Sequence, residues 1–277
     1  MPLLAIKVVV ISLQHGNTAV TAFAHTSYAS IAANIFENYA EAYEFGKLAL
    51  ELNKKFNGVA LASRIAALFA GFVNIYQMPL STSWDYLQEG IKAGLETGDF
   101  TFIGYCCFHL ATQMLGKGAA LAAVEAESSR LLSIVRPIRE VFSVGAVSVV
   151  LQAVRNLTGA THSRETLSSE GFDEETFRES FKKAEFTTLE CWYYSSKLQL
   201  AYLYRDFTAA QALAHEAQAR VGGALGLHFV TDLHFYTCLT LTALSPLPKE
   251  EAAGADALLN RLLPQLKKWA DSCPENY

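Results

Sequence analysis

The sequence predicts an all-α fold made of antiparallel helical hairpins, and three observations support this prediction. The chain of 277 residues is 51% hydrophobic and 18% charged, which provides enough apolar surface for a large core. Ala- and Leu-rich segments of helical length recur, and no sustained alternation of Val, Ile and Thr indicates a sheet. Turns containing Gly, Asn or Pro separate these segments, so that hairpins recur at roughly 35 to 45 residues. We expect one helical-repeat domain over residues 1–277, a right-handed α-solenoid of about six hairpins.

The first half of the chain divides into helices at turns of recognisable chemistry. Gly and Asn in the turn 15–18 supply the left-handed backbone found at many helix ends. Pro79 cannot continue a helix, and Ser81 or Ser83 is a natural N-cap for the next one. Asp99 is placed to cap the helix that follows it. The expected helices are 1–13, 18–36, 40–56, 59–76, 83–96, 100–115 and 119–134.

The second half of the chain is less regular. Arg136-Pro137 is expected at the start, or in a kink, of a helix that runs towards Val154. The polar stretch 158–170 is a candidate mobile loop, and an acidic helix opens after it. Prolines in the stretch 245–248 end the penultimate helix. The expected helices are 172–185, 188–202, 207–217, 228–244 and 249–271.

One pattern occurs twice, near each end of the chain, and it indicates close helix packing. An aromatic residue is followed by small residues three, seven and ten positions later, which is the tetratricopeptide spacing. The ring fills the turn of a hairpin, and the small side chains let its second helix approach the first. The two copies are Tyr39, Ala42, Gly46 and Ala49, and Phe207, Ala210, Ala214 and Ala217.

Charge and cysteine usage exclude several classes of function. A net charge of −5 with only scattered lysine pairs argues against binding to nucleic acid or to an anionic membrane, because both need a basic surface. The five cysteines contain no C-x-x-C pair, which favours reduced, mostly buried thiols in a cytoplasmic protein. The apolar start lacks the charged region of a signal peptide, and it is interpreted as the second helix of a hairpin.

No motif for catalysis, metal binding or cofactor binding can be assembled from the sequence. Phosphate-binding loops, dinucleotide fingerprints, zinc-protease motifs and kinase motifs are absent. His228 and His234 stand six apart, which does not suit two ligands on one helix, and we expect core or rim histidines with satisfied hydrogen bonds. Cys106-Cys107 lies close to His109 in the sequence, but on a helix this spacing does not make a nucleophile site. We therefore expect a non-enzyme without metal or cofactor.

Aromatic side chains gather in the second half of the chain and have two interpretations. Core packing is the first, because rings bury large areas and favour edge-to-face pairs. A groove on the concave face of the solenoid is the second, where rings with polar tips accept a partner. The candidate binding residues of that groove are Trp192, Tyr193, Tyr202 and His228.

Several stretches together resemble one family over nearly the whole chain. They are His15-Gly16-Asn17-Thr18 with Phe23, His25 and Tyr28, Tyr43-Glu44-Phe45-Gly46-Lys47-Leu48-Ala49-Leu50, Gly94-Leu95-Glu96-Thr97-Gly98-Asp99-Phe100, Phe235-Tyr236, and Lys267-Lys268-Trp269-Ala270 with Pro274-Glu275-Asn276-Tyr277. In this order they are similar to the tetratricopeptide-like helical region of large hybrid sensor kinases. There, a serine/threonine-kinase-like domain and an AAA-type ATPase precede the helical region, and a GAF domain and a histidine kinase follow it.

The resemblance implies a regulatory arm that couples a nucleotide switch to an output kinase. It implies that this chain is a segment of a longer protein, and that its partners are the neighbouring ATPase, GAF or kinase domains, or other proteins. No catalytic residue of the family can be transferred, because none of its catalytic motifs lies in this segment. A small-molecule-sensing arm of a signal-transducing ATPase is the alternative function, and an independent enzyme is the least favoured one.

Overall fold

The computed structural model describes residues 2–184, 186–246 and 248–277, and within them the chain is helical apart from an isolated β-bridge between Ser169 and Phe172. The all-α prediction is therefore confirmed. The helices are α1 (Pro2–His15), α2 (Ala19–Asn34), α3 (Tyr39–Lys55), α4 (Val59–Phe72), α5 (Thr82–Thr97), α6 (Phe100–Gly116), α7 (Leu121–Val135), α8 (Val141–Leu157), α9 (Glu174–Ala184), α10 (Thr187–Leu203), α11 (Phe207–Gln218), α12 (Phe229–Ala243) and α13 (Lys249–Ser272), with short 3-10 helices η1 (Asn74–Tyr76) and η2 (Val221–Ala224).

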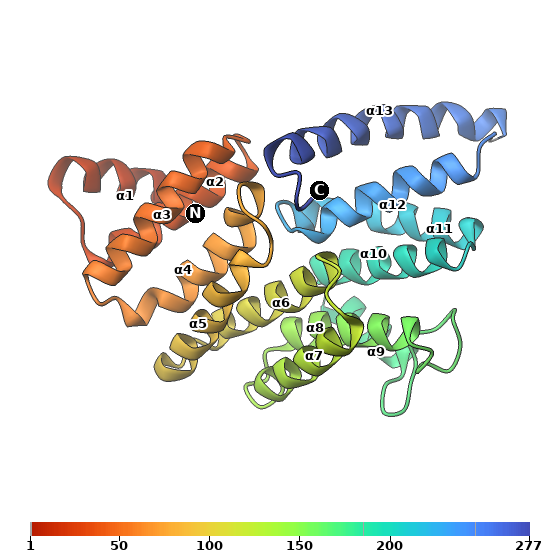
Figure 1. The fold of residues 1–277 in the computed structure, drawn as a ribbon, viewed down its shortest axis with the longest axis horizontal. Helices are drawn as coiled ribbons and strands as arrows, with labels where there is room; N and C mark the ends of the chain where they lie inside the picture. Colours follow the sequence, from red (N-terminus) through yellow and green to blue (C-terminus); the bar gives the residue numbers. More distant parts are fainter. Residues whose placement is uncertain (1, 185, 247) are drawn as a thin grey trace.

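The even-numbered helices form one continuous layer, from α2 through α4, α6, α8 and α10 to α12, each packed against the next (Figure 1). The helices α3, α5, α7, α11 and α13 each pack against the even-numbered helix that precedes them. Contact between α6 and α12 brings distant parts of the layer together. By length and composition, the segment Val59–Tyr76 could cross a membrane, but 61% of it is buried in the fold, as in a core helix.

The repeated pattern of small residues does what its spacing predicts. Ala42, Ala49, Ala210 and Ala217 are completely buried. At Gly46 an added Cβ would lie 2.6 Å from the ring of Phe69, so glycine permits the close approach of α3 and α4. Phe207 contacts Tyr202 on the preceding helix at a centroid distance of 5.5 Å, as expected for a turn-filling ring. Tyr39 instead stacks at 4.4 Å on Tyr76, beyond the end of α4.

Three predicted helix boundaries need correction. Pro137 neither starts nor kinks a helix: α7 ends at Val135, and the left-handed Arg139 (φ 55°) turns the chain before α8. The carboxylate of Glu140 caps α8 by accepting a hydrogen bond from the Ser143 N–H at 2.6 Å. Asp99 stands at the N-cap of α6, but its carboxylate accepts from Arg64 Nε at 2.7 Å instead of capping the backbone.

The start of α5 is the third predicted helix boundary that needs correction. Ser81 occupies its N-cap position with a helical backbone and without a capping hydrogen bond from its side chain. Ser83 is completely buried, and its Oγ accepts a hydrogen bond from Asn74 Nδ2 at 2.9 Å. Neither serine therefore caps the helix, because the buried amide of Asn74 organises this turn instead.

Candidate functional site

A cavity of about 790 Å³ lies between helices from several parts of the chain, and aromatic rings form much of its lining. Its walls come from α4, from the first half of α6, from the connection between α7 and α8 with the start of α8, from the start of α10 and from the η2 region. We call it the phenylalanine cavity and define it by Phe72, Phe102, Phe108, His109, Phe142 and Phe186. Its volume lies in the range of roughly 300 to 1,000 Å³ that small-molecule sites occupy.

The rings of the cavity pack against one another edge to face. The Phe108 and Phe142 centroids lie 5.4 Å apart with an interplanar angle of 74°, and Phe142 and Phe186 lie 6.3 Å apart at 83°. Phe72 meets the His109 imidazole at 5.2 Å and 81°. Because each such contact fixes the orientation of a ring, the walls are ordered by their own packing.

His109 is the one strongly buried polar side chain among the cavity-lining residues that the structure describes, with 4% of its surface exposed. Burial lowers the pKa of His109 to about 3, so the imidazole is neutral at physiological pH. Within the described residues, no hydrogen bond reaches either of its ring nitrogens. An added Cβ on Gly71 would lie 2.4 Å from Nε2, so glycine makes room for the ring. A neutral imidazole has one donor and one acceptor nitrogen, so His109 can form a hydrogen bond with a ligand in the cavity.

The mouth of the cavity is apolar and carries two opposite charges. Phe100 is 51% exposed, Val141 is 64% exposed and Leu225 is 67% exposed, although all three are large hydrophobic side chains. Arg139 and Glu140 lie beside them, and the Glu140 carboxylate is already engaged at the start of α8. Exposed apolar side chains around a concavity are typical of binding surfaces.

The four residues predicted to bind a partner lie outside this cavity. Trp192, Tyr193 and His228 are 3%, 4% and 5% exposed, and Tyr202 is partly buried against Phe207. The Trp192 Nε1–H donates to the Ala146 carbonyl at 3.1 Å. Core packing therefore accounts for three of them, and their role in binding stays a prediction.

Trp192 does reach the cavity indirectly. Its ring contacts Phe229 at 5.0 Å, and Phe229 in turn contacts the wall residue Phe108 at 6.4 Å, so Trp192 is two ring contacts away from the cavity wall. The sequence signal that marked the cavity was the aromatic density at the start of α6, in Phe100, Phe102, Tyr105 and Phe108. The sequence alone does not predict the cavity, because the rest of its wall comes from other helices.

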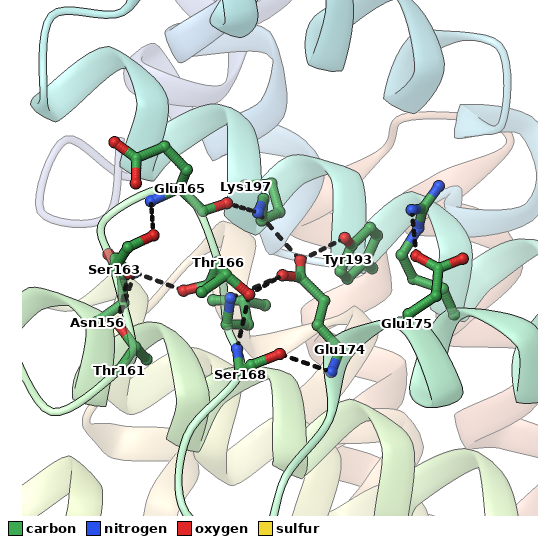
Figure 2. A network of polar contacts seen from close by, with 12 residues as sticks. Asn156, Thr161, Ser163, Glu165, Thr166, Ser168, Glu174, Glu175, Tyr193 and Lys197 are labelled. Carbon is green, nitrogen blue, oxygen red and sulfur yellow. Dashed lines mark hydrogen bonds and ion pairs between the residues drawn. The ribbon is translucent and has the colours of Figure 1, made fainter.

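The candidate mobile loop 158–170 is held by a polar network (Figure 2). Asn156 Nδ2 donates to three backbone carbonyls of the loop, the nearest being that of Thr166 at 2.9 Å. The Glu174 carboxylate accepts from the Thr166 hydroxyl at 2.6 Å, from the Leu167 N–H at 2.8 Å and from the Tyr193 hydroxyl at 2.5 Å. The loop is therefore anchored at several points, and its mobility stays a prediction.

Lys197 completes this network from α10. Its ammonium lies 3.0 Å from Glu174 Oε1 and also donates to the Glu165 carbonyl. Burial alone would raise the pKa of Glu174, but the hydrogen bonds from Thr166 and Tyr193 and the Lys197 charge together hold it below its ordinary value. Glu174 is thus a buried carboxylate with a structural role, fully occupied by its partners.

Other titratable groups that are buried do not assemble into a reactive site. All five cysteines are free and buried, as predicted, and burial raises the pKa of Cys107 and Cys191 to about 12, which disfavours the nucleophilic thiolate. His228 is a core histidine whose ring nitrogens form no hydrogen bond of good geometry with the described residues, although the nearby Asn276 backbone opposes the lowering of its pKa by burial. Within the same residues, no three His, Cys, Asp or Glu side chains are grouped to hold a metal ion.

The outer face of α1 is a second surface with unusual exposure. Five large apolar side chains of α1 are between 46% and 83% exposed, namely Leu3, Leu4, Val10, Ile11 and Leu13. Leu4 also lines an apolar groove of about 410 Å³ between α1 and α2. Lys7 is the one Lys, Arg, Asp or Glu residue of α1. This face has the composition of a surface that is covered by another helix.

No family model matches this chain, and no curated protein is significantly similar to it. The class of protein that the fold and these surfaces define is an all-α protein of stacked helical pairs. Its function is therefore inferred from the geometry of its own residues.

Proposed function

We propose that this chain is a non-catalytic helical-repeat module that mediates protein-protein interaction and regulation in a signal-transducing kinase or ATPase. The module is tetratricopeptide-like, a right-handed solenoid of about six hairpins in the cytoplasm. Two features support this proposal: the continuous layer of even-numbered helices, and the two buried copies of the small-residue pattern. The partners are the neighbouring ATPase, GAF or kinase domains.

The exposed apolar face of α1 is the observation that carries the proposal. Leu3 and Val10 are seven residues apart, and so are Leu4 and Ile11, which places each pair on one side of the helix over two turns. A stripe of this kind fits the apolar face of an amphipathic helix. Lys7 favours an acidic residue on the partner helix opposite it. We propose that such a helix of a neighbouring domain covers α1.

The test is calorimetric titration of the purified chain with the ATPase and GAF domains of a full-length hybrid sensor kinase. Leu3→Glu with Val10→Glu is expected to weaken binding at least about tenfold, which corresponds to about 1.4 kcal/mol. Leu263→Glu, at a position on α13 that is also 51% exposed, is the control and should leave binding unchanged. Equal effects of the two variants, or no binding of the unaltered chain to any of these domains, would contradict the proposal.

A small-molecule-sensing arm is the second candidate function, and the phenylalanine cavity favours it. The cavity has the volume of a ligand site, and its lining includes the buried, neutral imidazole of His109. Thermal unfolding with a panel of metabolites tests this function. A ligand at a hundredfold excess over its dissociation constant stabilises the folded state by about 2.7 kcal/mol, so a specific shift is expected for one class of compound.

A further inference from the structure

We propose that the phenylalanine cavity binds an uncharged aromatic molecule of two or more rings, whose single hydrogen-bonding group meets His109. This proposal rests on the small-molecule function above and adds the chemistry of the ligand and the residues that recognise it. Walls, charges and the buried imidazole each restrict what can enter.

The walls select aromatic groups. Phe72, Phe102, Phe108, Phe142 and Phe186 come from four segments and present ring edges and faces towards the cavity. Aromatic ligands can continue the edge-to-face contacts that these rings already make with one another. A volume of about 790 Å³ exceeds what one small ring fills, so a ligand of at least two rings is needed for close contact with opposite walls.

The distribution of charge selects a neutral molecule. Among the cavity-lining residues that the structure describes, the ones with permanent charge are Arg139 and Glu140, which are sequence neighbours of opposite sign at the mouth. Neither is among the buried residues of the chain, so an anion or a cation that moved deeper would lose its hydration without a counter-charge. The neutral imidazole of His109 offers a hydrogen bond and no charge.

His109 fixes the orientation of the ligand. The rings of Phe72 and Phe108 each contact the imidazole at a centroid distance of 5.2 Å, so the position of the imidazole is set by ring packing. A neutral imidazole carries one acceptor nitrogen and one N–H donor. An amine N–H, a phenolic hydroxyl or a carbonyl of the ligand can therefore form a hydrogen bond with His109, which a purely hydrocarbon ligand cannot do.

The experiment is a fluorescence titration of the full chain with N-phenyl-1-naphthylamine, which is uncharged and has two aromatic parts and one N–H. We expect one molecule bound per chain, at least about tenfold more tightly than the sulfonated analogue 8-anilinonaphthalene-1-sulfonate. His109→Leu should weaken binding of the uncharged probe at least about tenfold. The difference in affinity between the uncharged and the sulfonated probe should therefore become smaller.

Because His109→Leu also changes the core, Thr101→Trp provides a second test. Thr101 is an exposed part of the cavity lining, so a large ring there obstructs entry without altering buried packing. Ser27→Trp, which fills the apolar groove between α1 and α2, is the matched control. Thr101→Trp should abolish binding and Ser27→Trp should preserve it, with folding checked by circular dichroism.

Three results would overturn the proposal: binding that survives Thr101→Trp in a folded protein, binding that Ser27→Trp abolishes, or equal affinity for the two probes. The outcome is independent of the proposed protein interaction, which is measured with partner domains and depends on the outer face of α1. Loss of partner binding with intact probe binding contradicts only the interaction, and the reverse result contradicts only the ligand.

Discussion

Asn276 Oδ1 accepts a hydrogen bond from the backbone N–H of Leu80 at 2.8 Å, which joins the end of the chain to the connection before α5. The same amide donates through Nδ2 to the carbonyls of Ile75 and Met78, at 2.8 and 2.7 Å. Next to it, Lys117 Nζ donates to the Glu275 carbonyl at 3.0 Å. Figure 1 places the C-terminus accordingly, near the centre of the molecule and beside one end of α12. One side chain therefore satisfies three backbone groups of a turn far away in the sequence.

Asn276→Ala is expected to destabilise the fold by about 1 to 3 kcal/mol, because it leaves the buried backbone groups around Leu80 without partners. In a chain of this size, each kcal/mol lowers the melting temperature by roughly 2 to 4 °C. Asn260→Ala, at an exposed position of α13, is the control. Thermal unfolding followed by circular dichroism measures both. Equal melting temperatures for the two variants would mean that Asn276 does not hold the turn.

Glu174→Gln is expected to reduce stability near pH 7 by about 1.5 to 3 kcal/mol, since it weakens hydrogen bonds to a charged group. The folded-state pKa of Glu174 lies below its ordinary value of 4.5, so its contribution is present above pH 4.5 and is lost as the pH falls through the folded pKa. The difference between the two proteins should therefore shrink in acid. Urea denaturation near pH 7 and near pH 3.5 measures it.

Glu175→Gln is the matched control for this prediction. Glu175 pairs only with Arg178 at 2.9 Å among its described contacts, and its side chain is 65% exposed. An exposed ion pair of this kind contributes little to the free energy of unfolding. If Glu175→Gln costs as much as Glu174→Gln, the network around loop 158–170 does not stabilise the protein through the buried carboxylate.

Asp232→Asn is expected to stabilise the protein at alkaline pH. Burial raises the pKa of Asp232 to about 7, and this carboxyl lies one helical turn after the buried His228. Because the folded-state pKa of Asp232 is raised, the contribution of this group to stability is greatest below pH 3.8 and is lost as the pH rises through 7. Each tenfold change in proton affinity is worth about 1.4 kcal/mol, so the variant should gain stability near pH 8 and little near pH 4. Asp256→Asn, at an exposed position, should show no such dependence.

Gly46→Ala tests the close packing of α3 on α4. The added methyl group would meet the ring of Phe69, which is 1% exposed and has little room to move, so we expect a loss of about 1 to 3 kcal/mol. Gly254→Ala in α13 meets no atom within 4 Å and should stabilise the protein by up to about 1 kcal/mol. Chemical denaturation measures the free energy of unfolding of both variants. If both substitutions change it in the same direction, the close approach of α3 and α4 at Gly46 does not require glycine.

Turn and capping residues differ in how well the local sequence predicts their structure. Gly98 has the left-handed backbone (φ 74°) expected at the end of α5, and Gly118 has it after α6, so both turns follow from the residue type alone. Residue type also predicts that Asp99 and Ser83 cap helices, but their side chains form hydrogen bonds with Arg64 and Asn74. A local rule cannot include partners that packing brings from another helix.

The sequence by itself determined that the chain is all-α, where most of its helices begin and end, and that small residues at fixed spacing pack two helices closely. These properties depend on hydrogen bonds and side-chain sizes within a few residues. Only the tertiary structure decided that Trp192 is buried, that Asn276 holds the turn at Leu80, and that His109 faces a cavity of aromatic rings. The physical reason is that a cavity wall and a buried hydrogen bond are shared between segments far apart in the chain, and their partners are set by how the helices stack.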